Sequence, residues 1–243
     1  MTDGPTYYGY LTFNSPLSDQ RADALARRLT ACAPATVLDI GCGWGELLLR
    51  ILAAAPGARG RGIDTDRRVL DRGRDAAAAR GLGERVDLTA APGAEAGEPA
   101  DLVLCVGSTH ALADELGPAL AALRRLVTPG GRLLLGEGFW AERGPVDRTR
   151  VWEDMLAMPD LGGLVDAAVA AGFRPLHVET ANTDEWDAFE SGYLADSEEW
   201  LLTHGDHPRA EEVRVEADEH RRRWLQGYRH GLGFGYLTLG VPA

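Results

Sequence analysis

The sequence predicts an α/β fold: a doubly wound, mostly parallel seven-stranded sheet whose seventh strand is antiparallel, with a helical insertion between strands six and seven. Three observations support this prediction. Short apolar segments alternate with segments of helical periodicity through the first half of the chain. Several of those segments lack polar alternation, which is typical of parallel strands covered on both faces. The second half is largely helical before a last apolar run at residues 234–239.

The first half opens with a predicted helix that Ser18 caps and that ends before Pro34. The predicted strands that follow occupy residues 36–40, 61–64, 85–90, 101–106 and 132–136. The predicted helices between them occupy residues 46–55, 67–80 and 116–127. Because connections of this kind are right-handed, the alternation gives a doubly wound sheet.

The rhythm changes after residue 136. Helices are predicted over residues 151–158 and 161–171, a sixth strand over 175–180, a long helical stretch over 183–229 that breaks near 205–208, and a seventh strand over 234–239. We therefore expect a single domain over residues 1–243. Its segments are an N-terminal lid and helix (1–33), a cofactor-binding core (34–181), a helical insertion (182–230) and the last strand (231–243).

The composition argues against some classes of binding partner. Its 243 residues carry 25 basic and 37 acidic side chains, a net charge of −12, whereas nucleic-acid binders usually need a basic surface. No apolar run approaches the roughly 20 residues that span a bilayer, and no signal peptide is visible. We expect a cytoplasmic protein without a nucleic-acid or membrane partner. The three cysteines form an odd, sparse set that predicts no metal site.

The strongest motif is V-L-D-I-G-C-G-W-G-E at residues 37–46, a buried strand that runs through a glycine turn into a helix. Many nucleotide-binding folds share such a turn, so the spacing of its glycines is needed to distinguish one kind of ligand from another. In a dinucleotide fingerprint that starts at Gly41, the third glycine would fall at Glu46. A carboxylate there would repel a pyrophosphate. The acidic Asp39 likewise suits a cationic ligand better than a diphosphate.

Asp64 ends the second predicted strand, next to the first in a doubly wound sheet. A carboxylate at this position can bind both hydroxyls of a ribose. The expected ligand is thus a nucleoside without phosphates that carries positive charge near residues 41–45. S-adenosylmethionine (SAM) fits that description.

Four segments resemble a known family. They are VLDIGCGWGELL from residue 37, GID at 62–64, ADLVLCVGSTHAL at 100–112 and LRRLVTPGGRLLLGEGFW at 123–140. Their order and spacing resemble the motifs of class I SAM-dependent methyltransferases over roughly residues 34–181 and again in the last strand. FNSPLS, GEGFW and GFGYLTL are similar to a poorly characterised bacterial small-molecule branch of that family.

The resemblance implies a set of cofactor contacts. The methionine part would contact Asp39, Gly41, Cys42, Gly43 and Gly45. The ribose would contact Asp64, the adenine would contact Gly93 and Ala94, and the sulfonium region would contact Cys105 and Val106. Pro92 stands where many relatives carry an aspartate for the adenine amino group, so backbone and apolar contacts would have to suffice there. A structural role remains open for Asp39, Cys42 and Cys105.

Candidate acceptor residues follow the carboxyl ends of strands four and five, where open α/β sheets bind ligands. His110 is a candidate general base or an ordinary loop residue, and Glu137 is a second catalytic candidate or a partner of Arg143. Aromatic residues are the substrate candidates, as an aromatic wall, an N-terminal lid or a stripe on the inserted helix: Trp140, Tyr10, Phe13, Phe189 and Tyr193.

The expected function is methyl transfer from SAM to a small-molecule acceptor, on oxygen or nitrogen with carbon as a further alternative, and S-adenosyl-L-homocysteine is the product. A SAM-binding sensor or interaction module without methyl transfer is the alternative. An NAD-type oxidoreductase is disfavoured by Glu46.

Overall fold

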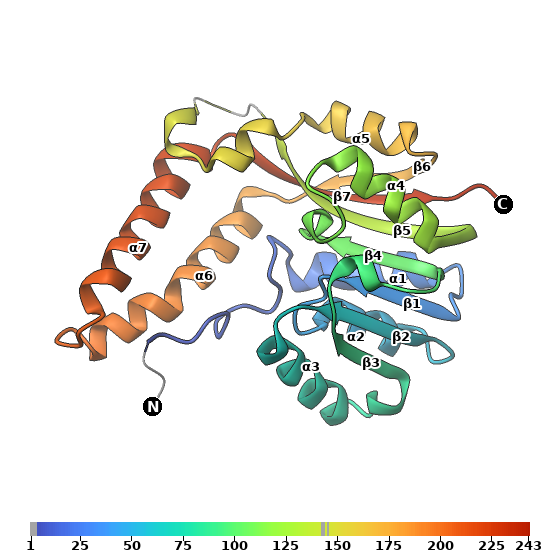
Figure 1. Ribbon diagram of the computed structural model, residues 1–243, viewed down its shortest axis with the longest axis horizontal. Coiled ribbons are helices and arrows are strands. Elements are labelled where there is room, and N and C mark those ends of the chain that lie inside the picture. The colour runs from blue at the N-terminus through green and yellow to red at the C-terminus, as the bar shows by residue number, and fades with distance from the viewer. Residues whose placement is uncertain (1–3, 142–143, 145) are drawn as a thin grey trace. The chain divides into compact units, whose positions relative to one another are not determined.

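The computed structural model describes residues 4–141, 144 and 146–243 (Figure 1). The chain divides into two compact units. The sheet unit comprises Ser18–Glu137, Leu161–Thr180 and Phe234–Ala243, and the helical unit comprises Met1–Leu17, Gly138–Asp160 and Ala181–Gly233. The predicted segment limits within one domain stay a prediction.

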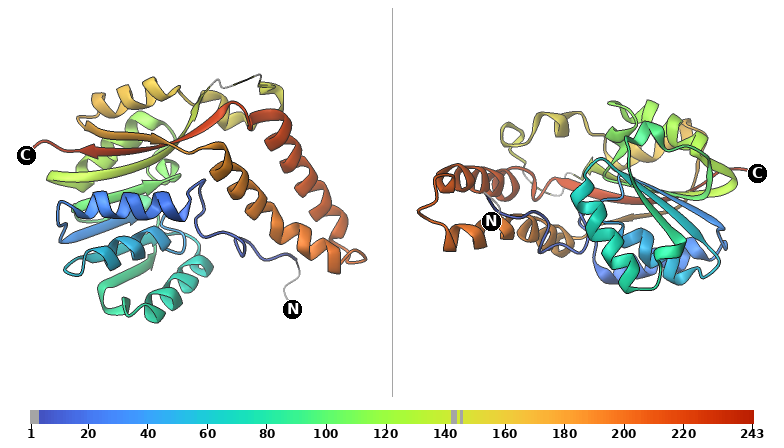
Figure 2. Two further views of the ribbon diagram at one scale, coloured as in Figure 1. Left: turned by 180° about the vertical axis from the view of Figure 1, so that it is seen from behind. Right: turned by 60° about the horizontal axis from the view of Figure 1, so that its bottom comes forward.

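The sheet has seven strands in the order β3-β2-β1-β4-β5-β7-β6 (Figures 1 and 2). They are β1 (Thr36–Ile40), β2 (Arg59–Asp64), β3 (Val86–Ala90), β4 (Ala100–Val106), β5 (Val127–Trp140), β6 (Arg174–Thr180) and β7 (Leu232–Gly240). Strands β1 to β5 pair in parallel, whereas β7 runs antiparallel to β6. The predicted fold class, including the antiparallel last strand, is therefore confirmed.

The helices of the sheet unit precede or separate its strands along the chain. They are α1 (Asp19–Thr30), α2 (Glu46–Ala54), α3 (Arg67–Ala79), α4 (Leu116–Leu126) and α5 (Leu161–Ala170), with short 3-10 turns η1 (Gly83–Arg85), η2 (Gly93–Glu95) and η3 (Thr109–Ala111). The Ser18 hydroxyl accepts a hydrogen bond from the backbone N–H of Arg21 at the start of α1. Helices α1 and α4 lie on opposite faces of the sheet (Figures 1 and 2).

The predicted helix at residues 151–158 is wrong. The structure instead has 3-10 turns η4 (Arg148–Arg150) and η5 (Glu153–Ala157). The indole N–H of Trp140 donates to the Met155 carbonyl at 2.8 Å, and the Trp140 backbone N–H donates to the Pro159 carbonyl at 2.8 Å. Tertiary hydrogen bonds thus occupy backbone acceptors here, and Pro159 contributes no N–H to continue a helix.

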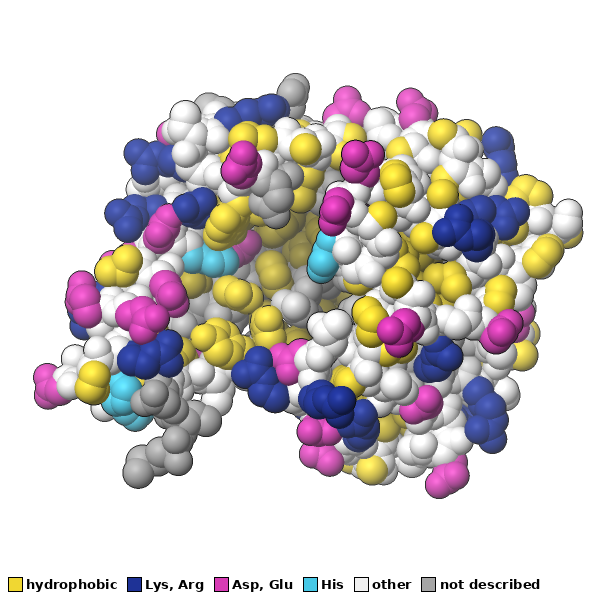
Figure 3. All heavy atoms as spheres, viewed as in Figure 1, with side chains coloured by type: hydrophobic (Ala, Val, Ile, Leu, Met, Phe, Trp, Pro, Cys, Tyr) yellow, Lys and Arg dark blue, Asp and Glu magenta, His cyan; other side chains and the backbone are white. Residues whose placement is uncertain are grey.

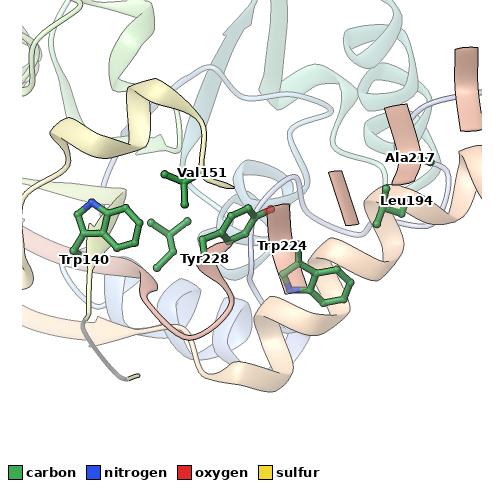
Figure 4. Packing of buried hydrophobic residues seen from close by; sticks show 7 residues of the cluster. Trp140, Val151, Leu194, Ala217, Trp224 and Tyr228 are labelled. Carbon is green, nitrogen blue, oxygen red and sulfur yellow. The ribbon is translucent and has the colours of Figure 1, made fainter. Parts of the chain in front are cut away.

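The helical unit is built on α6 (Thr183–Thr203) and α7 (Ala210–Arg222), followed by the π-helical turn η6 (Arg223–Tyr228). A capping box between Asn182 and Glu185 starts α6. The predicted insertion between β6 and β7 is therefore helical. The hydrophobic core cluster of the helical unit consists of Trp140, Val151, Leu194, Ala217, Trp224, Tyr228 and Leu232 (Figure 4). Within the described part of the chain, no helix is both long and apolar enough to cross a bilayer.

Candidate functional site

The turn after β1 requires glycine at three positions. Gly41, Gly43 and Gly45 have φ angles of 65°, 56° and 69°, in the left-handed region that side chains disfavour. A Cβ atom on Gly41 would lie 2.3 Å from the Ser108 Cβ. At Gly43 an added Cβ would meet nothing within 4 Å. The first glycine therefore allows close packing against the segment after β4, while the second leaves open space above the backbone.

Asp64 organises this turn from the end of β2. Its Oδ2 accepts a hydrogen bond from the Gly43 N–H at 2.8 Å, and its Oδ1 accepts one from the Asp66 N–H at 3.0 Å. Each carboxylate oxygen retains a further lone pair for a ligand. Asp64 thus positions the glycine turn in addition to its predicted contact with a ribose.

Asp39 is a buried carboxyl group at the same end of β1. Only 6% of the residue is exposed, and no hydrogen bond to its carboxyl group occurs among the described residues. Burial, followed by the charge of Asp64, raises the pKa of Asp39 to about 8. A positively charged ligand beside it would offset both effects. The described residues hold no cluster of three or more His, Cys, Asp or Glu side chains arranged for a metal.

The two cysteines of the predicted cofactor site are ordinary thiols. Burial, reinforced by Asp39 and Asp64, raises the pKa of Cys42, and burial raises the pKa of Cys105 to about 12. The Cys105 thiol lies 3.4 Å from the Ser108 hydroxyl, which donates to the Ile40 carbonyl at 2.5 Å. These groups tie β4 to β1 and supply no nucleophile.

The predicted adenine turn lies beside the segment that carries His110. Gly93 is buried, and a Cβ on it would lie 2.6 Å from the Ala111 carbonyl oxygen, so the two segments approach closely. Ala94 is exposed. Val106, at the end of β4, is partly buried. The structure therefore brings the turns after β1, β3 and β4 to one end of the sheet.

Thr109, the residue before His110, contacts Glu137. The Thr109 hydroxyl donates to the Glu137 Oε2 at 2.5 Å. His110 is exposed, and no hydrogen bond to its imidazole occurs among the described residues. Arg143, the alternative partner considered for Glu137, lies outside the described residues. The catalytic roles of both residues stay predictions.

The predicted substrate residues lie in the helical unit and differ in exposure. Tyr10 is 59% exposed, whereas Phe13 and Trp140 are buried. Phe189 and Tyr193 are partly buried on α6, with ring centroids 6.3 Å apart. Trp186 continues this row, 6.1 Å from Phe189. The predicted aromatic stripe therefore exists on one helix, and its contact with a substrate stays a prediction.

The sequence analysis did not predict a polar cluster formed by Glu190, His220 and Tyr228. The Glu190 Oε2 lies 2.7 Å from His220 Nε2, and the Tyr228 hydroxyl donates to Glu190 Oε1 at 2.7 Å. Glu190 is only 3% exposed. The signal available was a carboxylate next to Phe189 and four residues after Trp186, on the buried side of a predicted helix. Its partner on another helix could not be identified by spacing.

Comparisons with known proteins agree with this fold. The family described as a methyltransferase domain matches residues 38–133, from β1 into β5. The uncharacterized protein YjhP of Escherichia coli is 28% identical over 93% of this chain and 92% of its own length. Its crystal structure superposes with a TM-score of 0.83 at 26% identity, covering 95% of both chains.

Two bacterial enzymes solved with S-adenosyl-L-homocysteine are similarly close. The SAM-dependent methyltransferase of Thiobacillus denitrificans has a TM-score of 0.83 at 25% identity, covering 94% of each chain. That of Geobacter sulfurreducens has a TM-score of 0.81 at 24% identity, covering 95% of this chain and 94% of its own, and shows the shared fold. This chain has the Rossmann-like fold of these proteins, acts as a SAM-dependent methyltransferase and uses SAM as its cofactor.

Proposed function

We propose that this enzyme methylates an oxygen or nitrogen atom of a small-molecule acceptor. SAM supplies an electrophilic methyl group on a sulfonium. The chain has to bind the two reactants, align them for in-line displacement and exclude water.

Asp39 and Asp64 divide the binding of the cofactor in this proposal. The buried Asp39 carboxylate faces the cationic methionine part, since it lacks a hydrogen-bond partner among the described residues. Asp64 accepts from the ribose hydroxyls with the lone pairs that the Gly43 and Asp66 N–H groups leave free. Gly93 and Ala94 offer backbone and a small apolar surface to the adenine. Open space above Gly43 leaves room for the ligand.

The observation that carries the small-molecule assignment is the aromatic row on α6. Trp186, Phe189 and Tyr193 follow one another with centroid separations of 6.1 and 6.3 Å. Phe189 and Tyr193 are neither fully buried, as ordinary core rings are, nor fully exposed. Partly covered rings in a row suit the apolar body of a compact acceptor.

The charge distribution supports the same assignment. Acidic and basic side chains alternate over the face seen in Figure 3, and the chain has a net charge of −12. A nucleic-acid substrate is normally held by a continuous basic surface. This surface offers little counterion release and therefore little affinity for a polyanion.

The test follows the label from methyl-tritiated SAM into fractions of a bacterial extract. The proposal predicts incorporation into the fraction below about 1 kDa, with the nucleic-acid and protein fractions unlabelled. A matched reaction with the Asp64→Ala variant identifies enzyme-dependent label. Label confined to nucleic acid or protein would contradict the small-molecule assignment.

A further inference from the structure

We propose that His220, held by the buried carboxylate of Glu190, accepts the proton of the acceptor's hydroxyl group, and that the acceptor is a hydroxylated aromatic ring. This inference rests on the proposed function and deepens it. It uses only contacts within the helical unit. His220 touches the acceptor directly, whereas Glu190 and Tyr228 are positioning residues.

The hydrogen bonds of Glu190 fix the proton on His220. An ionised carboxylate only accepts hydrogen bonds, and its two oxygens lie 2.7 Å from His220 Nε2 and 2.7 Å from the Tyr228 hydroxyl. Nε2 therefore carries the hydrogen, and in neutral imidazole the lone pair is on Nδ1. Burial, followed by the charge of Glu190, raises the pKa of Tyr228, so the phenol keeps the proton that it donates.

The imidazole of His220 is partly exposed, unlike the carboxylate that holds it. The His220 side chain is 21% exposed, against 4% for Glu190. No hydrogen bond to Nδ1 occurs among the described residues. A carboxylate that orients a histidine whose other nitrogen is free is the arrangement by which many enzymes prepare a general base.

The surroundings of His220 indicate the shape of the acceptor. Tyr193 stacks on the imidazole at 5.1 Å and 28°, and the Trp152 ring meets it edge-on at 5.1 Å and 70°. Trp152 also lies 5.6 Å from the Tyr228 ring. Flat π surfaces beside the basic nitrogen favour a flat aromatic acceptor that extends this packing.

The chemistry selects a phenolic hydroxyl over an aliphatic alcohol. Proton transfer to imidazole is efficient when donor and acceptor pKa values are not far apart, and a phenol titrates near 10, as tyrosine does. As the methyl group moves, the sulfur–carbon bond breaks and the oxygen–carbon bond forms. The hydroxyl proton passes to Nδ1, the sulfonium becomes a neutral thioether, and Glu190 stabilises the imidazolium through Nε2–H. The proton then leaves to water.

His110 lacks the features that prepare His220. It is exposed, and no carboxylate orients its imidazole among the described residues. Its ring therefore has no fixed proton position and no charge to stabilise the imidazolium. The geometry favours the histidine of the helical unit as the proton acceptor.

The experiment compares phenols and naphthols that are protonated at about pH 8 with 4-nitrophenol, which is largely ionised there. His220→Gln retains an amide N–H for Glu190 but has no basic nitrogen, and the exposed His204 provides the control variant His204→Gln. We expect His220→Gln to lower kcat for the protonated acceptors by roughly 10²–10⁴-fold and that for 4-nitrophenol by less than about fivefold. SAM affinity and the His204→Gln enzyme should be unchanged.

Glu190→Gln tests the positioning role. It should lower kcat for the protonated phenols by about tenfold or more, keep their KM within about threefold and again spare 4-nitrophenol. Equal losses for ionised and protonated acceptors, or no loss in His220→Gln, would overturn the base assignment. Methylation of extract metabolites without methylation of any phenol or naphthol would overturn the acceptor class alone. Absence of any methylated small molecule would instead defeat the proposed function.

Discussion

The sheet unit and the helical unit differ in how the sequence specifies their proposed binding residues. In the sheet unit, Gly41, Gly43, Asp39 and Asp64 lie within 26 residues of one another, and backbone geometry decides their roles. In the helical unit, His220 contacts Glu190 across 30 residues of sequence, and this side-chain contact is the basis of their proposed roles. In our proposals, cofactor binding therefore depends on a local sequence motif, whereas acceptor chemistry depends on how two helices pack.

The largest loss of SAM affinity is expected for a substitution at Gly43. Gly43→Val places a β-branched side chain at φ 56° and in the open space above the turn. We expect SAM affinity to fall at least about 100-fold, or about 2.7 kcal/mol, measured by calorimetry. Gly57→Val, at an exposed glycine with similar free space and no positive φ, is the control. Retained affinity in Gly43→Val would remove this turn from the cofactor site.

Asp64→Ala should produce the next largest loss. It removes the acceptor for the Gly43 and Asp66 N–H groups together with the proposed ribose contact. Losing hydrogen bonds to a charged group costs about 1.5–3 kcal/mol, so SAM affinity should fall about tenfold to 150-fold. The exposed Asp75 provides the control variant Asp75→Ala. If both variants bind SAM like the parent, the ribose assignment is wrong.

Asp39 should couple SAM binding to proton release. Its pKa is about 8 in the unliganded protein and near 3.8 when unperturbed, so the folded state holds a proton between these values that the unfolded chain has lost. The stability of the unliganded protein should therefore decline as pH rises from about 4 to 8, and Asp39→Asn should abolish that decline.

A cation bound beside Asp39 restores the carboxylate and expels the proton. Calorimetry at about pH 7 in two buffers of different ionisation enthalpy should detect proton release on SAM binding to the parent. Asp39→Asn should release correspondingly less. Identical proton release in both proteins would show that Asp39 does not face the cationic part of SAM.

Phe189→Ala and Tyr193→Ala test whether the helical unit affects acceptor binding without affecting SAM binding. Each should raise the acceptor KM about tenfold, since each removes a partly buried ring worth on the order of 1.5 kcal/mol of apolar contact. SAM affinity should stay within about twofold. Leu202→Ala, at a residue of the same helix that is 80% exposed, is the control. Equal losses of both affinities with a lower Tm would identify the rings as ordinary core.

The smallest effect is expected for His110→Gln. Its imidazole is exposed and no carboxylate among the described residues orients it, so turnover should change less than about tenfold. Steady-state kinetics beside His220→Gln gives the comparison. A loss of 10²-fold or more in His110→Gln alone would move the base to the sheet unit.

Local signals account for what could be predicted. The glycine turn, the apolar strands and the cap at Ser18 depend on residues close in sequence, and all of them occur in the structure. The segment at residues 151–158 could not be predicted because the Trp140 indole, outside the segment, donates to its Met155 carbonyl. The pairing of Glu190 with His220 was hidden for the same reason. Long-range contacts leave no period in the sequence.

The most direct test of this division measures both KM values in one matched pair of variants, with the acceptor identified by label transfer. The account predicts that Asp64→Ala raises the KM for SAM by about tenfold or more and leaves that for the acceptor within about twofold. Tyr193→Ala should do the reverse. A pair of variants that raises both KM values in parallel would contradict the assignment of cofactor and acceptor recognition to separate units.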